Sequence, residues 1–357
     1  MNDIDPWTTS QRLDHEELEK GMGNEEQEMK PRVCFFARVA DPSVLERVEF
    51  YAQDIQILRD LGCDLHIATH LYDIRPADLY FVWWWTWAFY PIAAARVLRK
   101  PVVVTGVIDL QVFAPRPKLH QRLMKFALKS ADANIFVSRM EEEQIPRLFR
   151  VNKPRYAPLV VDTNLYRPNG TRDDVVFSVG WLSEENAERK GMLELLQAAP
   201  LIRKSHPEIR FVIAGEKGTA FPRLQELAQS LGVADALEFV GKISGEEKIR
   251  WMQRCKVYLQ PSRFEGFGLA ILEAMSCGAP VVSRPVGAVP EVVGDAGILV
   301  ESGSPQAIAQ AVINLLDQPA RRQELGERSR KRAVESFPFE RRRAELGKIL
   351  DEFLPRS

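Results

Sequence analysis

Short apolar runs alternate with longer amphipathic segments from residue 32 almost to the end of the chain. The apolar runs predict β-strands at 33–37, 63–68, 78–83, 101–105, 133–137, 175–179, 210–214, 237–240, 257–259, 280–282 and 297–300. Apolar positions at helical spacing predict α-helices at 45–61, 88–98, 118–130, 139–149, 192–204, 222–231 and 246–255. Strands that alternate with helices of this length predict an α/β architecture, in which helices cover both faces of parallel sheets.

A turn-rich stretch, Arg167-Pro168-Asn169-Gly170-Thr171, separates two such series and predicts a domain boundary. We therefore expect one domain over 31–168 and a second over 169–337. Each would be a doubly wound sheet. Because ligands of such sheets bind at the carboxyl ends of the strands, we expect a cleft for a small ligand between the two domains.

The two ends of the chain differ from this alternation. Residues 1–30 are acidic and polar, and they predict a disordered tail. Residues 305–354 are helical in pattern, with breaks at Pro319 and Pro338, where proline removes a backbone donor.

The amino-acid composition of the chain argues against several classes of partner and site. Lys and Arg number 48 against 49 Asp and Glu, so the chain has no overall positive field and nucleic acid is not an expected partner. The four cysteines form no CxxC pair, and His66 and His70 lack a carboxylate that would complete a metal-binding pattern. We expect no metal site and no disulfide. Without a basic segment followed by an apolar one at the start, the cytoplasm is the expected compartment.

The loop and helix around 263–275 carry the chemistry that stands out. Gly266 and Gly268 leave backbone N–H groups unobstructed at the first turn of a helix, where the dipole favours a diphosphate. As a dinucleotide fingerprint the stretch is incomplete, because Ile271 stands where a third glycine would be, and a tight loop is the plainer interpretation. Glu265 and Glu273 could each accept two hydroxyl donors of a sugar or ribose, or could be solvated surface charges.

The stretch from Pro261 to Met275 resembles the donor-site signature of retaining glycosyltransferases of family 4, also called group 1, which have the GT-B fold. The resemblance extends over 172–335 in the order typical of the family, and it includes Val240-Gly241, 280–282, 287–293 and 295–297. It implies two Rossmann-like domains that face each other across a cleft. The last helix, within 338–357, resembles the family helix that crosses back to the first domain.

The resemblance implies a role for each matching residue. Glu273 would hold the ribose of a nucleotide diphosphate sugar, and Glu265 would lie beside the donor sugar. Lys190 would neutralise the departing diphosphate, although a plain surface charge is the alternative. The backbone of the loop and of the base pocket would contribute through Gly266, Phe267, Gly268, Leu269, Val240 and Gly241. No metal and no other cofactor is implied.

The sequence departs from the family pattern at three places where the family has residues of the diphosphate or donor-sugar site. Gly180 is followed by Trp181 where the family usually has a diphosphate-binding Arg, and Arg189 is the candidate replacement. The usual glycine pair is missing from 40–44. No His follows the strand at 101–105, so Asp109 is the nearest polar candidate, with a loop cap as its alternative role. These departures keep a second hypothesis open, a catalytically inactive relative that binds nucleotide or sugar as a regulatory or partner subunit.

Two features of the first domain concern the acceptor, which could be a carbohydrate, a lipid-linked molecule or a small molecule. Indole rings at a strand end could stack on an acceptor, or half of them could be buried: Trp84, Trp85 and Trp87. A basic stripe, opposite Leu119, Leu123, Phe126 and Ala127, predicts a solvated helix face or a peripheral contact with the inner membrane face: Lys118, Arg122, Lys125 and Lys129.

Overall fold

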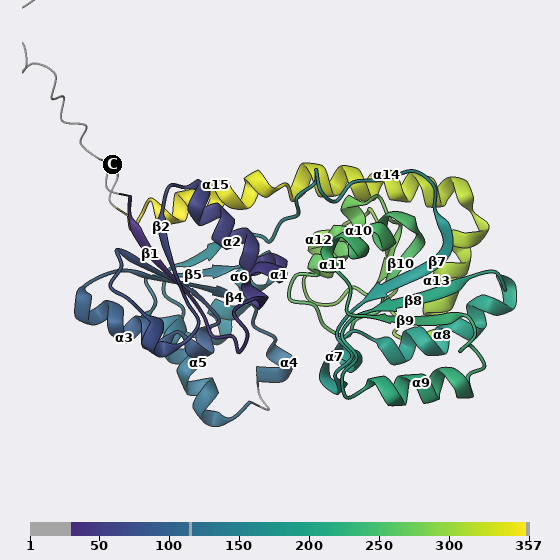
Figure 1. Cartoon of the computed structure of the whole chain (residues 1–357), viewed down its shortest axis with the longest axis horizontal. Helices are drawn as coiled ribbons and strands as arrows, with labels where there is room; N and C mark the ends of the chain where they lie inside the picture. Colours follow the sequence, from purple (N-terminus) through teal and green to yellow (C-terminus); the bar gives the residue numbers. More distant parts are fainter. Residues whose placement is uncertain (1–29, 114–115, 355–357) are drawn as a thin grey trace, which may run out of the picture.

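Two six-stranded parallel sheets form the centres of the two halves of the chain (Figure 1). The computed structural model describes residues 30–113 and 116–354. The tail predicted at 1–30 lies, apart from Lys30, outside the described residues. The α/β prediction is confirmed, with both sheets fully parallel and covered by helices.

The first sheet has the strand order β2-β1-β3-β4-β5-β6. Its strands are β1 (Arg32–Ala37), β2 (Asp64–Ala68), β3 (Leu79–Trp83), β4 (Val102–Gly106), β5 (Ala133–Phe136) and β6 (Pro154–Tyr156). The helices between them are α1 (Val44–Arg47), α2 (Glu49–Asp60), α3 (Phe89–Leu98), α4 (Leu110–Phe113), α5 (Lys118–Ser130) and α6 (Arg139–Leu148). Single turns of 3₁₀-helix occur at Leu71–Asp73 and Trp85–Trp87.

The second sheet has the order β12-β11-β10-β7-β8-β9. Its strands are β7 (Asp173–Val179), β8 (Arg210–Ala214), β9 (Leu237–Gly241), β10 (Cys255–Gln260), β11 (Val281–Ser283) and β12 (Ile298–Leu299). The helices are α7 (Glu184–Arg189), α8 (Met192–Ser205), α9 (Phe221–Ser230), α10 (Gly245–Arg254), α11 (Leu269–Ser276), α12 (Val289–Val293), α13 (Pro305–Asp317), α14 (Pro319–Ser336) and α15 (Phe339–Leu350).

Both faces of each sheet are buried, which explains the continuous apolar runs in the strands. In β1, Val33 and Phe35 belong to one core cluster and Cys34 and Phe36 to another. Successive side chains of a strand point to opposite faces, so a strand covered on both sides needs apolar residues at every position.

Each strand predicted from an apolar run is present, but some elements were missed. The strand β6 was missed because Pro154 and Arg155 interrupt any apolar pattern, as is tolerated at the edge of a sheet. The short helix α7 was missed because its residues are almost all polar. The segment predicted as one helix at 45–61 is two, since Val48 between α1 and α2 has an extended backbone.

The C-terminal helices run across both halves of the molecule, with α14 over the second domain and α15 over the first (Figure 1). The chain bends at Pro338 between them. On α15, the fully buried Arg342 donates to both oxygens of Asp54 on α2, at 2.6 and 2.9 Å. The indole of Trp83 donates to the same carboxylate at 3.0 Å. A buried ionic network thus fastens the end of the chain to the first domain.

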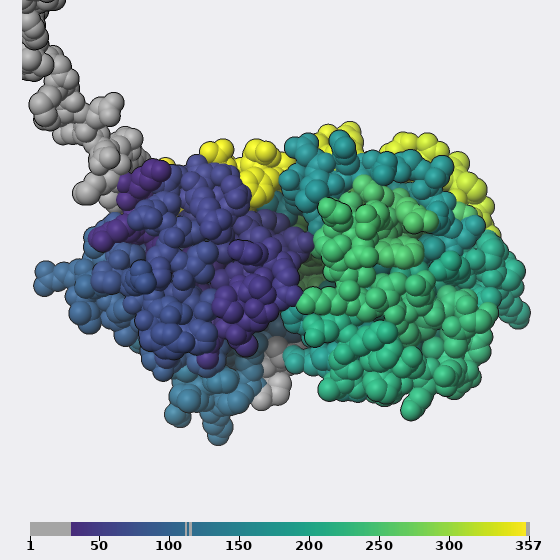
Figure 2. Space-filling model, in the orientation of Figure 1, coloured from purple at the N-terminus to yellow at the C-terminus, as the bar shows by residue number. Residues whose placement is uncertain are grey.

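The two domains meet along a seam (Figure 2). Across it, Lys248 of α10 contacts Glu49 of α2 at 2.5 Å. Glu291 of α12 also crosses the seam, since it accepts from the backbone N–H of Arg139 and from the hydroxyl of Tyr156, each at 2.8 Å. The domains are therefore closed onto each other. Among the described residues, no helix is long and apolar enough to span a bilayer.

Candidate functional site

The loop from β10 to α11 lies at the seam and is shaped by close backbone contacts. Gly268, which precedes α11, has φ +91°, a conformation that favours glycine. Gly266 packs against the first domain so closely that an added Cβ would lie 2.0 Å from Cγ1 of Val107. The glycines of this loop therefore permit the approach of the opposite domain as well as the tight turn.

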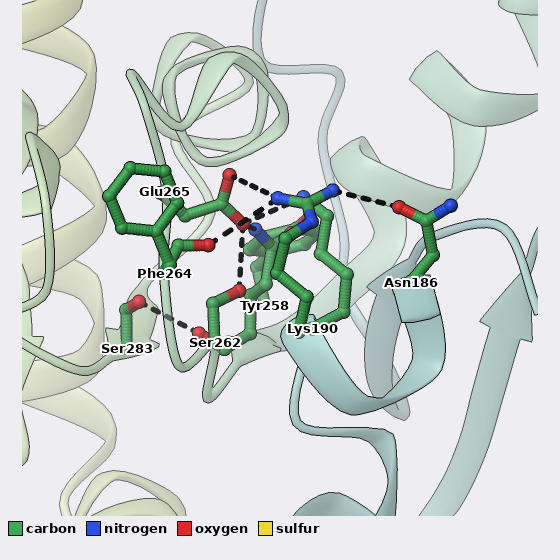
Figure 3. Close-up of polar contacts among 9 residues, drawn as sticks. Asn186, Lys190, Tyr258, Ser262, Phe264, Glu265 and Ser283 are labelled. Carbon is green, nitrogen blue, oxygen red and sulfur yellow. Dashed lines mark hydrogen bonds and ion pairs between the residues drawn. The ribbon is translucent and has the colours of Figure 1, made fainter. Parts of the chain in front are cut away.

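Glu265 is the centre of a buried polar cluster and is only 5% exposed. Its Oε1 accepts from Lys190 Nζ at 2.7 Å and from Ser262 Oγ at 2.7 Å, and both side chains point to the carboxylate in Figure 3. Gln260 Nε2 donates to the same oxygen at 2.6 Å. Arg189 Nη1 lies 3.5 Å from Oε2. Two cations and two neutral donors thus surround one carboxylate.

These donors determine the charge of Glu265. Burial alone would raise the pKa of this carboxyl, but the charges of Lys190 and Arg189 and the hydrogen bonds lower it below its ordinary value. The carboxylate is therefore ionised at neutral pH. An ammonium has three protons, so Lys190 can hold Glu265 and still donate to a phosphate oxygen.

Lys190 is held in place by the turn between α7 and α8. The next residue, Gly191, has φ +68°, and a Cβ there would lie 2.2 Å from the carbonyl oxygen of Pro261. Arg189 also hydrogen-bonds to Asn186 Oδ1 at 3.0 Å and to the carbonyl of Phe264 at 3.4 Å. Arg189 thus reaches the loop between β10 and α11, a contact that could not be inferred from the sequence. Gly180 lies beside Lys190, with the lysine Cγ 3.2 Å from an added Cβ.

Glu273 lies on α11, one turn further into the domain, and is 2% exposed. Its Oε1 accepts from Lys248 Nζ at 3.0 Å. Burial, together with the nearby Glu49, raises the pKa of Glu273 to about 7, although Lys248 opposes the shift. The two glutamates of the motif therefore differ, because Glu265 stays ionised while Glu273 titrates close to neutrality.

Backbone groups complete the second domain's side of the seam. Phe267, Gly268 and Leu269 lead into α11, whose first N–H groups have no acceptor within the helix. The side chain of Phe267 is buried against Phe337. Val240 and Gly241 lie at the carboxyl end of β9, where Gly241 has φ +73° and accepts from Gly215 N–H at 2.8 Å. All these groups lie at the carboxyl edge of the sheet, where α/β sheets hold ligands.

Opposite this loop, the segment after β4 presents Val107, Ile108 and Asp109. Ile108 N–H donates at 2.7 Å to Oε1 of Glu141, a residue on α6 that is 1% exposed. Burial raises the pKa of Glu141 to about 8, and the nearby Glu291 and Asp109 add to the shift. Asp109 therefore lies close to a buried carboxyl. Glu141 was not predicted as a buried residue, because its charged neighbours in the sequence suggest a solvated helix face.

The three tryptophans considered for the acceptor have different surroundings. Trp85 is 1% exposed, donates to Asn134 Oδ1 at 2.7 Å and stacks on Phe136, so it belongs to the core and cannot stack on a ligand. Trp84 is partly exposed, has φ 76° and donates to the hydroxyl of Tyr51 at 2.5 Å. Trp87 is also partly exposed. Trp84 and Trp87 remain the candidates.

The helix α5 differs from the expected arrangement of apolar and basic faces. Leu119 is 63% and Phe126 is 47% exposed, whereas Met124, Ala127 and Leu128 face the core. The expectation that Leu119 and Phe126 would be turned inward is wrong, because the inward stripe starts from Met124. Apolar and basic side chains therefore share the outer face of α5, which contains Lys118, Leu119, Arg122, Lys125, Phe126 and Lys129.

Within the described ranges, no three His, Cys, Asp or Glu residues are grouped as metal ligands. All four cysteines are buried thiols.

Comparisons with known proteins place this geometry in a family. Residues 168–332 match the family described as Glycosyl transferases group 1. MMP alpha-(1->4)-mannosyltransferase of Mycolicibacterium hassiacum is 30% identical over 275 residues, a match that covers 74% of this chain and 62% of that relative. The chain thus spans less than two thirds of the relative's length.

Solved structures show the same fold. Sucrose-phosphate synthase of Thermosynechococcus elongatus superposes with a TM-score of 0.76 at 20% identity, over 90% of this chain and 99% of that one. HepE of Anabaena, solved in complex with UDP and glucose, gives a TM-score of 0.73 at 16% identity, over 90% of this chain and 100% of that one. The chain therefore has the fold of these structures over nine-tenths of its length, and its residues 168–332 belong to the group 1 glycosyl transferases.

Proposed function

We propose that the protein is a retaining glycosyltransferase, which moves a sugar from a nucleotide diphosphate sugar to a hydroxyl group of an acceptor. The observation that carries the proposal is the cluster around Glu265, in which Lys190 and Arg189 lie beside a helix N-terminus and a glycine loop. Positive charge next to free backbone N–H groups is the arrangement that binds a diphosphate. The family membership and the UDP complex of the similar HepE structure support this choice of donor.

Each group has a task in the proposed transfer. In the net transfer, the bond between the anomeric carbon and the diphosphate breaks, the acceptor oxygen bonds to the same carbon, and the proton of the acceptor hydroxyl is released. The diphosphate leaves with an additional negative charge. Lys190, Arg189 and the N–H groups at the start of α11 stabilise that charge. Glu265 is ionised and accepts hydrogen bonds from the donor sugar, while Glu273 accepts from the two ribose hydroxyls. Because these residues supply the positive charge, the proposal includes no metal and no organic cofactor.

The first domain would hold the acceptor and part of the donor sugar. Asp109 follows the segment that packs on Gly266, which supports it as the polar side chain of this domain that would contact the sugar. Trp84 and Trp87 lie past the end of β3 and could stack on an acceptor ring.

A lipid-linked acceptor would suit the outer face of α5. Residues 89–130 include eight Lys and Arg and a single acidic residue, Asp109. Exposed Leu119 and Phe126 add apolar area among these basic side chains. We propose that this face makes a peripheral contact with an anionic lipid surface, at the inner face of the membrane if the protein is cytoplasmic.

An inactive relative that only binds nucleotide is the second candidate. One observation favours it: Val107 packs against Gly266, in the segment where the family usually has a His that contacts the donor. In this reading, the pocket would bind a nucleotide sugar without transferring the sugar.

Two measurements on purified protein test the proposal and separate the candidates. Thermal shift with UDP, GDP and ADP, and with their common sugar conjugates, asks whether the pocket binds a donor. Donor consumption, with release of free nucleotide diphosphate, then asks whether the sugar is released. Binding with release supports a transferase, binding without release from any donor supports the inactive relative, and no binding by the wild type contradicts both.

A further inference from the structure

Glu273 shares a cation with a carboxylate of the opposite domain. Lys248 Nζ lies 3.0 Å from Glu273 Oε1 and 2.5 Å from Glu49 Oε1. The hydroxyl of Tyr166 donates to the same oxygen of Glu49 at 2.9 Å. The lysine side chain is 14% exposed and lies over the Tyr166 ring, 5.5 Å from its centroid. Two carboxylates, one ammonium and one phenol thus form a cluster in the seam.

The members of this cluster come from both domains and from the segment that joins them. Glu49 is the first residue of α2 in the first domain, whereas Lys248 and Glu273 lie on α10 and α11 of the second. Tyr166 is held to the second domain through its carbonyl, which accepts from Ser276 Oγ at 2.6 Å and Arg330 Nη1 at 2.7 Å. If the domains part, Glu49 must move away, while Lys248 and Glu273 stay together.

The charge of Lys248 strongly influences the protonation state of Glu273. Burial would lower the pKa of Lys248, but Glu273 and Glu49 raise it well above its ordinary value, so the lysine is charged. Burial and Glu49 raise the pKa of Glu273 to about 7 even with the lysine present. Without Lys248, two buried carboxylates would face each other, and Glu273 would take up a proton. A protonated carboxyl loses acceptor capacity for a diol.

We propose that Lys248 is a positioning residue of the donor site, a cation shared between Glu273 and Glu49. It favours the ionised form of Glu273, the side chain assigned to the ribose, and it makes the charge of Glu273 depend on whether the first domain is closed over it. This inference rests on the proposed function, since it gives Glu273 the ribose. In the open molecule Lys248 pairs with Glu273 alone, which leaves the carboxylate ready for a donor.

The titratable and charged groups that face Glu273 come from six parts of the fold. They are Glu49 of α2, Tyr166 of the connecting segment, Lys190 between α7 and α8, Lys248 of α10, Tyr258 of β10 and Cys277 after α11. Burial raises the pKa of Tyr258, Tyr166 and Cys277 above the range of interest, so these three stay neutral near pH 7. The pH dependence near neutrality therefore comes from Glu273, under the opposing influences of Lys248 and Glu49.

The test is the affinity for UDP-glucose and GDP-mannose, measured by calorimetry from pH 5.5 to 8.5 on the full chain. The bridging diphosphates of these probes do not titrate in this range, so the profile reports the protein. For the wild type, affinity should increase with pH through a midpoint near 7. Lys248→Met should raise the midpoint by about one unit, which weakens binding about fivefold at pH 7 and about tenfold at pH 5.5. Glu49→Gln should lower the midpoint.

Shifts in opposite directions from two substitutions that each remove one charge exclude a general loss of structure. Lys248→Arg should restore most of the affinity. Lys256→Met is the matched control, because Lys256 is also partly buried and paired with one carboxylate, that of Asp174. If the wild type binds and Lys248→Met leaves the midpoint unchanged, this inference is wrong and the proposed function stands. If Lys248→Met does not fold, an unchanged midpoint of the pH profile in Glu49→Gln overturns the inference. If the wild type binds neither these probes nor any other nucleotide sugar, the proposed function fails first.

Discussion

Val107 of the first domain lies against Gly266, in the loop between β10 and α11, so closely that there is no room for a Cβ on the glycine. We expect Gly266→Ala to displace either the loop or the β4–α4 segment, because the added methyl would lie 2.0 Å from Cγ1 and 2.9 Å from Cγ2 of Val107. The catalytic efficiency kcat/KM of donor consumption should fall at least about tenfold, since small misplacements at a reacting centre are costly.

The double variant Val107→Ala/Gly266→Ala serves as the control for this prediction. It removes both γ carbons that the new methyl would meet, and it should recover most of the lost kcat/KM. A double variant as impaired as Gly266→Ala would show that the glycine is needed for its own backbone and not for the contact across the seam.

Lys190→Met should reduce kcat/KM for donor consumption by about 10²–10³, the usual cost of removing one group that stabilises charge in the transition state. It should also leave the buried Glu265 with only Arg189 as a cation. Lys204→Met, an exposed lysine on the adjoining helix α8, is the control and should retain full activity. A loss of less than about threefold in Lys190→Met would remove this lysine from the proposed mechanism.

Glu141 should make the protein more stable at low pH than at high pH. Its pKa in the folded protein is about 8, above the ordinary value of 4.5. The folded state therefore keeps a proton that the unfolded chain loses, and stability falls as the pH rises from about 4.5 through about 8. Glu141→Gln stays neutral and can still accept from Ile108 N–H.

We therefore expect the melting temperature of Glu141→Gln to equal that of the wild type near pH 4.5 and to exceed it increasingly up to pH 8. Thermal unfolding at four pH values measures this difference. Glu143→Gln, exposed on the same helix, should show no such trend. A constant difference across the pH range would mean that Glu141 is ionised in the folded state.

Arg342→Met should destabilise the first domain by about 3–5 kcal/mol, because it leaves the buried carboxylate of Asp54 with only the indole of Trp83 as a donor. Denaturant unfolding followed by tryptophan fluorescence measures the change, since the indole of Trp83 contacts Asp54 directly. Arg343→Met, the exposed neighbour on α15, should be neutral. An equal effect of both substitutions would contradict the role assigned to the buried network.

The outer face of α5 should bind vesicles that contain phosphatidylglycerol and not vesicles of phosphatidylcholine alone. Leu119→Ser/Phe126→Ser should reduce this binding, and charge reversal at Lys118 and Arg122 should abolish it at low salt. Co-sedimentation with the two kinds of vesicle is the measurement. If Lys204→Glu, a reversal on the second domain, weakens binding as much, the face has no special role.

The sequence predicted the strands, and the loop and helix at 263–275, because their determinants are local. A continuous apolar run indicates a strand that is buried on both faces. Glu265 and Glu273 both belong to a single loop and helix, so their spacing is visible in the sequence. The partners of Glu265 were partly predictable as well, because Lys190 and Arg189 stand next to each other before a glycine.

The contacts across the seam could not be predicted in the same way. Lys248 and Glu49 are 199 residues apart, and neither belongs to a motif. Glu141 and Lys248 stand in polar helices whose composition suggests solvent, yet the opposite elements bury them. These residues are buried only because the two domains close on each other, which is a property of the tertiary structure. The protonation state of Glu273 depends on this burial, so it cannot be predicted from the sequence.

The chain passes between the domains twice, once before β7 and once at Pro338. The two passages lie side by side, since Val161 N–H donates to the carbonyl of Phe337 at 3.1 Å next to the bridge between Val161 and Pro338. A single tether would allow one domain to swivel in any direction. Two adjacent connections restrict the rotation of one domain relative to the other to a single axis. The relative motion of the domains is therefore limited to opening and closing of the seam.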